Sequence, residues 1–154
     1  MESRSFIKSW GAEFVAADTV RFRVWASGQE SIILRLSGKE FTMNPAGDGW
    51  FEFSATGIAP DAEYNYVLAD GTVVPDPASR GQKADVNGPS LAVNPDSYRW
   101  QNTQWRGRPW EETVFYELHV GTFTPEGTFR AAIEKLPYLT EMGITAIEIL
   151  PVSQ

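Results

Sequence analysis

Apolar and polar residues alternate in short runs through the first half of the chain. Val20, Phe22 and Val24, for example, alternate with polar or larger residues, the pattern of a β-strand with one buried face. Similar runs between turn residues predict further strands at 32–36, 41–43, 50–54 and 64–68, with the stretch 44–49 ending one of them. An Asp-Gly pair at 70–71 is a strong hairpin signal. Residues 1–75 are therefore predicted to form a small immunoglobulin-like β-sandwich.

The alternation is lost in residues 76–112, where prolines recur and polar residues predominate. Flexible linkers are ordinarily poor in aromatic residues, yet this stretch contains Trp100, Trp105 and Trp110. We therefore predict an ordered connector whose tryptophans pack against the flanking domains. Near its start, Asp76 and Arg80 are spaced for an ion pair, although a simple solvated turn fits the sequence equally well.

The period changes again after residue 112. A nearly continuous apolar run at 114–120 predicts a buried strand, and β-branched residues at 144–150 predict a second one. Between them, apolar residues three and four apart predict an amphipathic helix. This helix should be capped by Thr128, kinked or split by Pro137 and ended by Gly143. Strand, helix and strand together make one βαβ unit with parallel strands.

One βαβ unit does not make a domain, because parallel sheets are normally covered on both faces. A complete (β/α)₈ barrel takes about 250 residues. We therefore expect residues 113–154 to be the first βαβ unit of a truncated (β/α)₈ barrel, and the chain as a whole to be mainly β. Other strands and helices of a barrel would cover the apolar faces of residues 113–154. Without them, we expect this segment to be poorly ordered, packed back on residues 76–112, or buried in an oligomer contact.

Composition acts mainly by excluding classes of function. The 154 residues include no Cys and one His, which removes most thiol chemistry and metal sites, so no metal or other cofactor is expected. A net charge of −7 has the wrong sign for a nucleic-acid partner. No apolar run is long enough for a membrane span or a secretory signal, and a cytoplasmic location is expected.

A few residues invite a catalytic interpretation. Glu117 and Glu148 lie on the two predicted parallel strands, and His119 is the only histidine. Active sites of α/β barrels lie at the carboxyl ends of the strands, and His119 has no Ser-His-carboxylate or metal-ligand spacing around it. We interpret all three as structural polar contacts and predict no catalytic residue in the chain.

The tryptophans are candidates for sugar binding, because an aromatic face can stack on a sugar ring. Trp50, which follows a turn at the start of a strand, is the candidate substrate-binding residue. Trp10 and Trp25 are weaker candidates. The alternative is that these aromatic side chains seal an interface between domains.

Longer strings carry a family resemblance. VFYELHVGTFTPEGTF (114–129) and AAIEKLPYLTEMGITAIEILPV (131–152) resemble the first βαβ unit of the α-amylase family of glycoside hydrolases, family thirteen. FRVWA (22–26), PDPASR (75–80) and NGPS (87–90) resemble the amino-terminal carbohydrate-binding-like sandwich and connector of the same family. Ser27 and Asn87 depart from its usual Pro and His, at positions that are structural in the family.

The resemblance implies a retaining α-glucan hydrolase, most similar to enzymes that cut an α-1,4 bond to release trehalose from maltooligosyltrehalose. The carboxylates that act in the family all correspond to positions beyond Gln154, so this chain by itself is expected to be inactive. An α-glucan or maltooligosaccharide is the implied ligand. Two alternatives remain open: an amino-terminal glucan-binding module of a glycogen branching or debranching enzyme, and a structural spacer domain with no ligand.

Overall fold

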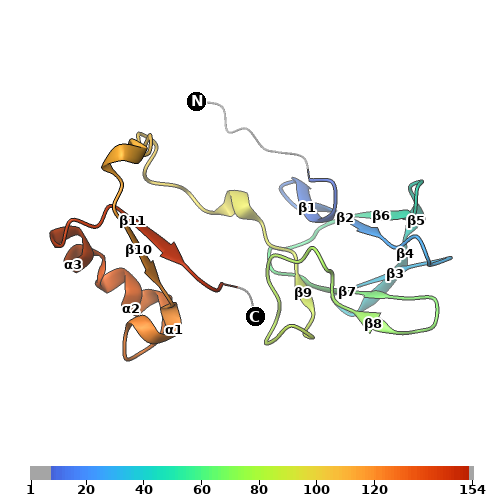
Figure 1. The fold of residues 1–154 in the computed structure, drawn as a ribbon. Helices are drawn as coiled ribbons and strands as arrows, with labels where there is room; N and C mark the ends of the chain where they lie inside the picture. Colours follow the sequence, from blue (N-terminus) through green and yellow to red (C-terminus); the bar gives the residue numbers. More distant parts are fainter. Residues whose placement is uncertain (1–7, 153–154) are drawn as a thin grey trace. The chain divides into compact units, whose positions relative to one another are not determined.

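The computed structural model describes residues 8–152, which belong to two compact units, Met1–Arg99 and Trp100–Gln154. The chain is mainly β, and the α-helices of residues 8–152 all belong to the second unit (Figure 1). Within the described part of the chain, none of the helices has both the length and the apolar character needed to cross a bilayer.

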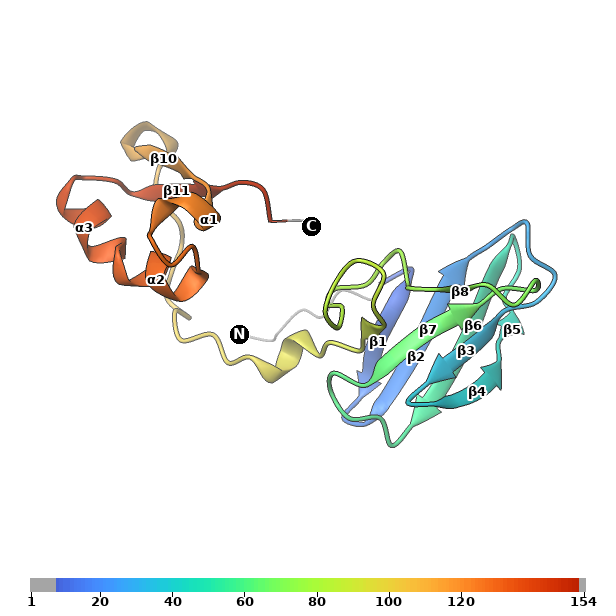
Figure 2. The same ribbon diagram turned by 90° about the horizontal axis from the view of Figure 1, so that it is seen from below.

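Two antiparallel sheets form the first unit and enclose a common core (Figure 2). One sheet has the strand order β1-β2-β6-β5, and the other has the order β4-β3-β7-β8, with β9 also paired to β7. The strands are β1 (Gly11–Ala16), β2 (Thr19–Trp25), β3 (Ile33–Leu36), β4 (Lys39–Thr42), β5 (Asn44–Pro45), β6 (Trp50–Thr56), β7 (Glu63–Val67), β8 (Val73–Val74) and β9 (Ser90–Leu91).

The predicted alternation accounts for this core. The inward residues of β2 and β3 are buried, and so are Tyr64 and Tyr66 of β7. The two sheets meet through aromatic rings, since the centroids of Phe22 and Tyr64 lie 4.9 Å apart in an edge-on arrangement. Burying each large apolar side chain contributes about 1.5–3 kcal/mol. The alternation of apolar and polar residues therefore specifies which side chains of β2, β3 and β7 face the core.

Strands β1 and β5 were not expected. β1 pairs with β2, and the register shifts between Phe14 and Ala16. Residues 44–49, expected only to end a strand, begin with β5, in which Asn44 and Pro45 pair with β6. A proline can lie there because β5 is at the edge of its sheet, where a missing N–H breaks no ladder.

The start of the expected connector, residues 76–93, also belongs to the first unit. Within it, β9 pairs with β7, and Asp76, Ser90 and Ala92 are buried. A two-residue strand has no periodicity, so the sequence pattern gave no sign of this pairing. The 3₁₀-helix η1 (Pro95–Ser97) follows before the first unit ends.

The second unit has the strand, helix and strand order that the sequence predicts. Its elements are η2 (Trp110–Glu112), β10 (Phe115–Leu118), α1 (Val120–Phe123), α2 (Phe129–Glu134), α3 (Leu136–Glu141) and β11 (Ala146–Ile149). β10 and β11 pair in parallel, as predicted. The Oγ1 atom of Thr128 accepts a hydrogen bond from the Ala131 N–H and caps α2. The helix breaks at Lys135, ahead of Pro137, and Gly143 follows α3 with a φ of 85°. The four-residue helix α1 was not expected.

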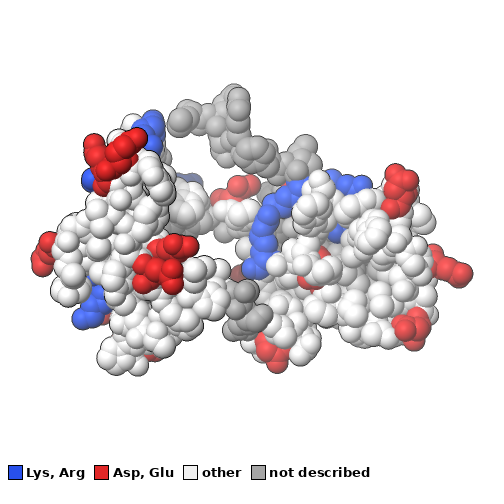
Figure 3. Space-filling model, viewed as in Figure 1, with Lys and Arg blue, Asp and Glu red and all other residues white. Residues whose placement is uncertain are grey.

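Much of the apolar surface of the second unit is uncovered within that unit. Leu118, Val120 and Leu139 are buried, whereas the exposed apolar residues include Phe115, Ile133, Tyr138, Met142 and Val152. Trp100, Trp105 and Trp110 are each three-quarters exposed, and the Trp110 ring lies 5.4 Å from that of Phe115. On the face shown in Figure 3, acidic side chains are scattered rather than gathered in one patch.

Candidate functional site

A pocket of about 310 Å³ in the first unit gathers three of the six tryptophans of the chain. It is lined by Trp10, Arg23, Val24, Trp25, Trp50, Asp76, Pro77 and Ala78. Trp50, the residue singled out from the sequence, therefore lies in a pocket together with the two weaker candidates. We call these eight residues the tryptophan pocket.

Strand register explains why the tryptophans meet. β2 and β6 pair so that Trp25 lies directly opposite Trp50. β1 pairs with β2 through Gly11 and Arg23, which brings Trp10, the residue before β1, to the same end of the sheet. Because alternate residues of β2 fill the core, Arg23 and Trp25 lie on its outer face.

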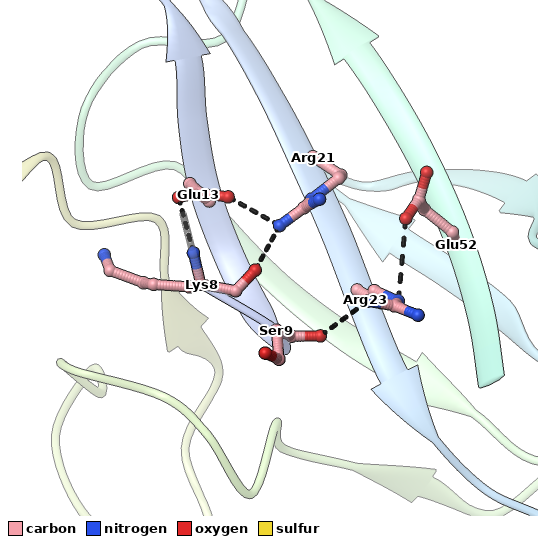
Figure 4. Close-up of polar contacts among 6 residues, drawn as sticks. All are labelled: Lys8, Ser9, Glu13, Arg21, Arg23 and Glu52. Atoms are coloured by element: carbon pink, nitrogen blue, oxygen red, sulfur yellow. Dashed lines mark hydrogen bonds and ion pairs between the residues drawn. The ribbon is translucent and has the colours of Figure 1, made fainter. Parts of the chain in front are cut away.

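The orientations of two tryptophans are fixed by contacts. The Trp25 Nε1–H donates a hydrogen bond to the backbone oxygen of Asp48 over 3.0 Å. The Cζ atom of Arg23 lies 4.5 Å from the ring centroid of Trp50, in a cation–π contact. Arg23 Nε lies 3.7 Å from Glu52 Oε2 (Figure 4). One face of Trp50 is thus occupied by a guanidinium whose charge is offset by a carboxylate.

The segment that carries Trp10 is tied to the sheet by a second polar cluster (Figure 4). Arg21 Nη2 lies 2.6 Å from Glu13 Oε2 and also donates to the backbone oxygen of Lys8. The Lys8 N–H donates in turn to Glu13 Oε1 over 2.9 Å, and Arg23 Nη1 donates to the backbone oxygen of Ser9 over 3.1 Å. The backbone directly before Trp10 is therefore held at several points, while the indole itself is 59% exposed.

Asp76 lines the pocket, but its carboxyl is buried and forms hydrogen bonds with residues of the core. Its Oδ2 atom accepts hydrogen bonds from the hydroxyls of Tyr64, over 2.8 Å, and Tyr66, over 3.2 Å. Its Oδ1 atom accepts from the Ala78 N–H. Burial raises the pKa of Asp76 above its usual value, although these hydrogen bonds favour the ionised form. The ion pair considered with Arg80 is thus replaced by a buried carboxyl bonded to two tyrosines.

The contacts with Asp76 also affect the pKa values of Tyr64 and Tyr66. Burial, followed by the nearby Asp76 carboxylate, raises the pKa of both the Tyr64 and the Tyr66 hydroxyl. Both hydroxyls therefore stay protonated and remain hydrogen-bond donors. Asp76 connects the pocket wall to the centre of the sandwich.

The other residues considered for catalysis lie in the second unit. Glu117 and Glu148 are register partners on β10 and β11, and both are exposed. His119 Nδ1 accepts a hydrogen bond from the Gly121 N–H over 3.1 Å and caps α1. The expected hydrogen bond of His119 is therefore present, and its structural role stays a prediction. Over residues 8–152, no three His, Cys, Asp or Glu side chains are grouped to hold a metal ion.

The sequence singles out Trp50 as a candidate, but it does not place Trp10 and Trp25 beside it. The alternation in β2 already places Trp25 on the outer face of its strand. The missing information was the register between strands distant in sequence, which alternation within one strand does not give.

The chain was compared with protein families and with curated proteins. No family model matches the chain. A malto-oligosyltrehalose trehalohydrolase from Deinococcus radiodurans is 44% identical over 133 residues, which cover 86% of this chain and 22% of that protein. Further curated proteins of the same name match at 40–43% identity.

Solved structures agree with this relationship. A Salmonella typhimurium protein, described as a candidate α-amylase, is 64% identical with a TM-score of 0.93, over 97% of this chain and 26% of that one. A type I pullulanase of Bacillus subtilis in complex with maltose has a TM-score of 0.78 at 23% identity, covering 96% of this chain and 24% of that one, and so shares the fold. The chain spans about a quarter of the length of these proteins. Over most of its length it is similar to malto-oligosyltrehalose trehalohydrolases, and the α-amylase-family resemblance seen in its sequence is confirmed.

Proposed function

We propose that this chain is part of a glycoside hydrolase that releases trehalose from maltooligosyltrehalose by cutting an α-1,4 bond with retention of configuration. The observation that carries the proposal is the 44% identity over 86% of the chain to a protein named for that activity. The branching-enzyme alternative has weaker support, because a 1,4-alpha-glucan branching enzyme of Streptomyces avermitilis is 33% identical over 151 residues, 87% of the chain. No observation of this kind supports the spacer domain.

The chain itself supplies no catalytic residue in this proposal. Retaining hydrolysis needs a nucleophilic carboxylate and a second carboxyl that acts as acid and then base. Asp76 is buried against two tyrosines. Glu117 and Glu148 lie within β10 and β11 rather than in the loops that follow, where the active sites of α/β barrels are built. The groups that perform hydrolysis therefore belong to the remaining three-quarters of such an enzyme.

We also propose that the two-sheet unit is an immunoglobulin-like sandwich and that the second unit is the first βαβ unit of a (β/α)₈ barrel. The parallel pairing of β10 and β11 and the exposed apolar side chains of that unit support the second part. Further barrel strands and helices would cover this surface, and in the isolated chain a contact between copies would do so.

The proposal is tested by a chimera. The matching segment of the Deinococcus radiodurans trehalohydrolase is replaced by this chain, and trehalose release from maltooligosyltrehalose is measured. The expected result is a folded enzyme that releases trehalose. The parent enzyme reassembled through the same junctions is the matched control. A folded chimera that releases no trehalose, or release of trehalose by the isolated 154-residue chain, would contradict the proposal.

A further inference from the structure

We propose that a small pocket beside the start of β1 binds a phosphate group, either as free phosphate or at the end of an organic ligand. The pocket has a volume of about 180 Å³ and is lined by Lys8, Ser9, Trp10, Ala12, Ala78 and Arg80. We call these six residues the basic pocket. All of them belong to the first unit. The inference is independent of the proposed function, because it rests on this lining alone.

The charge of the lining favours an anion. The basic pocket contains two cations, Lys8 and Arg80, and none of its residues carries a carboxylate. This balance is the reverse of that in the whole chain, which has 20 acidic and 13 basic residues. Like charges that share a small pocket repel each other, and an anion between them offsets that repulsion.

The two cations also lack the acidic partners that other cations of the first unit have. Those other cations form the ion pairs Arg21–Glu13, Arg23–Glu52, Arg35–Glu40 and Lys83–Glu63. Within residues 8–152, neither the Lys8 ammonium nor the Arg80 guanidinium pairs with a carboxylate, and the Ser9 hydroxyl and the Trp10 indole N–H donate to no acceptor. The donors of the basic pocket are therefore available to a ligand.

The backbone that carries both cations is held in place. The Lys8 N–H donates to Glu13 Oε1 over 2.9 Å, and the Lys8 side chain points away from the arginines of that cluster (Figure 4). On the other segment, the Ala78 N–H donates to Asp76 Oδ1 over 2.8 Å, which fixes the turn before Arg80. Asp76 itself does not line the basic pocket. Because both segments are preorganised, only side-chain freedom is lost when an anion binds.

A phosphate group matches these donors better than a carboxylate does. As an ester it carries a charge of about −1.5 to −2 near neutral pH and presents three strong acceptor oxygens. A guanidinium such as that of Arg80 can bind two of these oxygens, while the ammonium of Lys8 supplies a compact charge. The volume lies below the range of about 300–1,000 Å³ seen for sites that enclose a whole small molecule. The basic pocket thus suits the phosphate group itself.

The test is calorimetric titration of the 154-residue chain with inorganic phosphate at constant ionic strength. We expect saturable binding with a dissociation constant of roughly millimolar order or tighter. Lys8→Ala and Arg80→Ala should each weaken binding about tenfold, whereas Arg80→Lys should weaken it less because the charge remains. Lys39→Ala is the matched control, because Lys39 is an exposed cation of the same unit that lines a different pocket. Circular dichroism of each variant checks that the sandwich is folded.

Phenyl phosphate and acetate, titrated in the same way, identify the ligand. Tighter binding of phenyl phosphate than of inorganic phosphate points to a phosphate ester, and equal or weaker binding points to free phosphate; either result supports the inference. Acetate that binds as tightly as phosphate would overturn the assignment to phosphate. Absence of saturable phosphate binding, or binding that Lys39→Ala weakens as much as Lys8→Ala and Arg80→Ala do, would overturn the site.

Discussion

The hydroxyl of Tyr64 donates a hydrogen bond to Asp76 Oδ2 over 2.8 Å in the interior of the sandwich. This bond joins β7 to the segment that follows β8. The Asp76 N–H also donates a hydrogen bond to the Oγ atom of Ser90, in β9. Residues 76–93 are thereby part of the sandwich rather than a free linker. The same carboxyl lines the tryptophan pocket, so the pocket wall and the core depend on one residue.

Removal of the Asp76 side chain should therefore weaken the whole first unit. Asp76→Ala leaves the hydroxyls of Tyr64 and Tyr66 without their acceptor, and an unsatisfied buried donor costs about 1–3 kcal/mol. We expect a loss of unfolding free energy of about that size in urea titrations. Glu30→Ala, which removes an exposed carboxylate, should change it little. Equal effects of the two substitutions would show that the Asp76 contacts do not stabilise the fold.

The pH dependence of stability should carry the signature of Asp76. Burial raises its pKa in the folded state above the ordinary value of 3.8. The folded protein then binds more protons than the unfolded chain between these two pKa values. The contribution of Asp76 to stability is full below pH 3.8 and is lost as the pH rises through the folded pKa.

Asp76→Asn isolates this contribution because it removes the titration and keeps the shape. Urea unfolding of both proteins from acid to neutral pH should show the wild type losing stability relative to Asp76→Asn as the pH rises. A wild type that gains relative stability over the same range would mean that the pKa of Asp76 is lowered in the folded state.

Gly49 should tolerate no side chain. Its φ is 80°, and a Cβ added there would lie 2.6 Å from Ser27 Cβ. Gly47 has the same φ with open space around it. Gly47→Ala should cost about 1–2 kcal/mol for the left-handed backbone, and Gly49→Ala should cost a further 1–3 kcal/mol, roughly, for the steric overlap. Thermal unfolding of both variants measures the difference, and equal melting temperatures would contradict the close approach to Ser27.

Thr128 should control the start of α2. Thr128→Ala removes the acceptor for the Ala131 N–H and should destabilise the helix by about 1 kcal/mol. Amide hydrogen exchange at Ala131 should become faster, whereas Thr128→Ser, which retains the hydroxyl, should leave it nearly unchanged. Unchanged exchange in Thr128→Ala would show that the cap does not hold this turn.

The sequence predicts those elements in which one residue pattern repeats. The alternation around Val20 predicts β2, and the proline at residue 137 predicts the break between α2 and α3. β9 and α1 were missed because two or four residues show no period. The burial of Asp76 was missed for a related reason, since its partners on β7 come from another strand.

The candidate site, too, could be predicted only in part from the sequence. An aromatic residue at the start of a strand identifies Trp50, but its pocket depends on how three strands are paired. Trp25 joins it through the β2–β6 register, and Trp10 joins it through the β1–β2 register. These pairings depend on contacts between distant segments, which only the folded structure supplies.

The most direct test of the central claim is the rate of trehalose release from maltooligosyltrehalose by the chimera that carries this chain in a trehalohydrolase. The account predicts release above that of the isolated 154-residue chain, which should release none. A folded chimera that releases no trehalose, while the parent enzyme reassembled through the same junctions does, would contradict it.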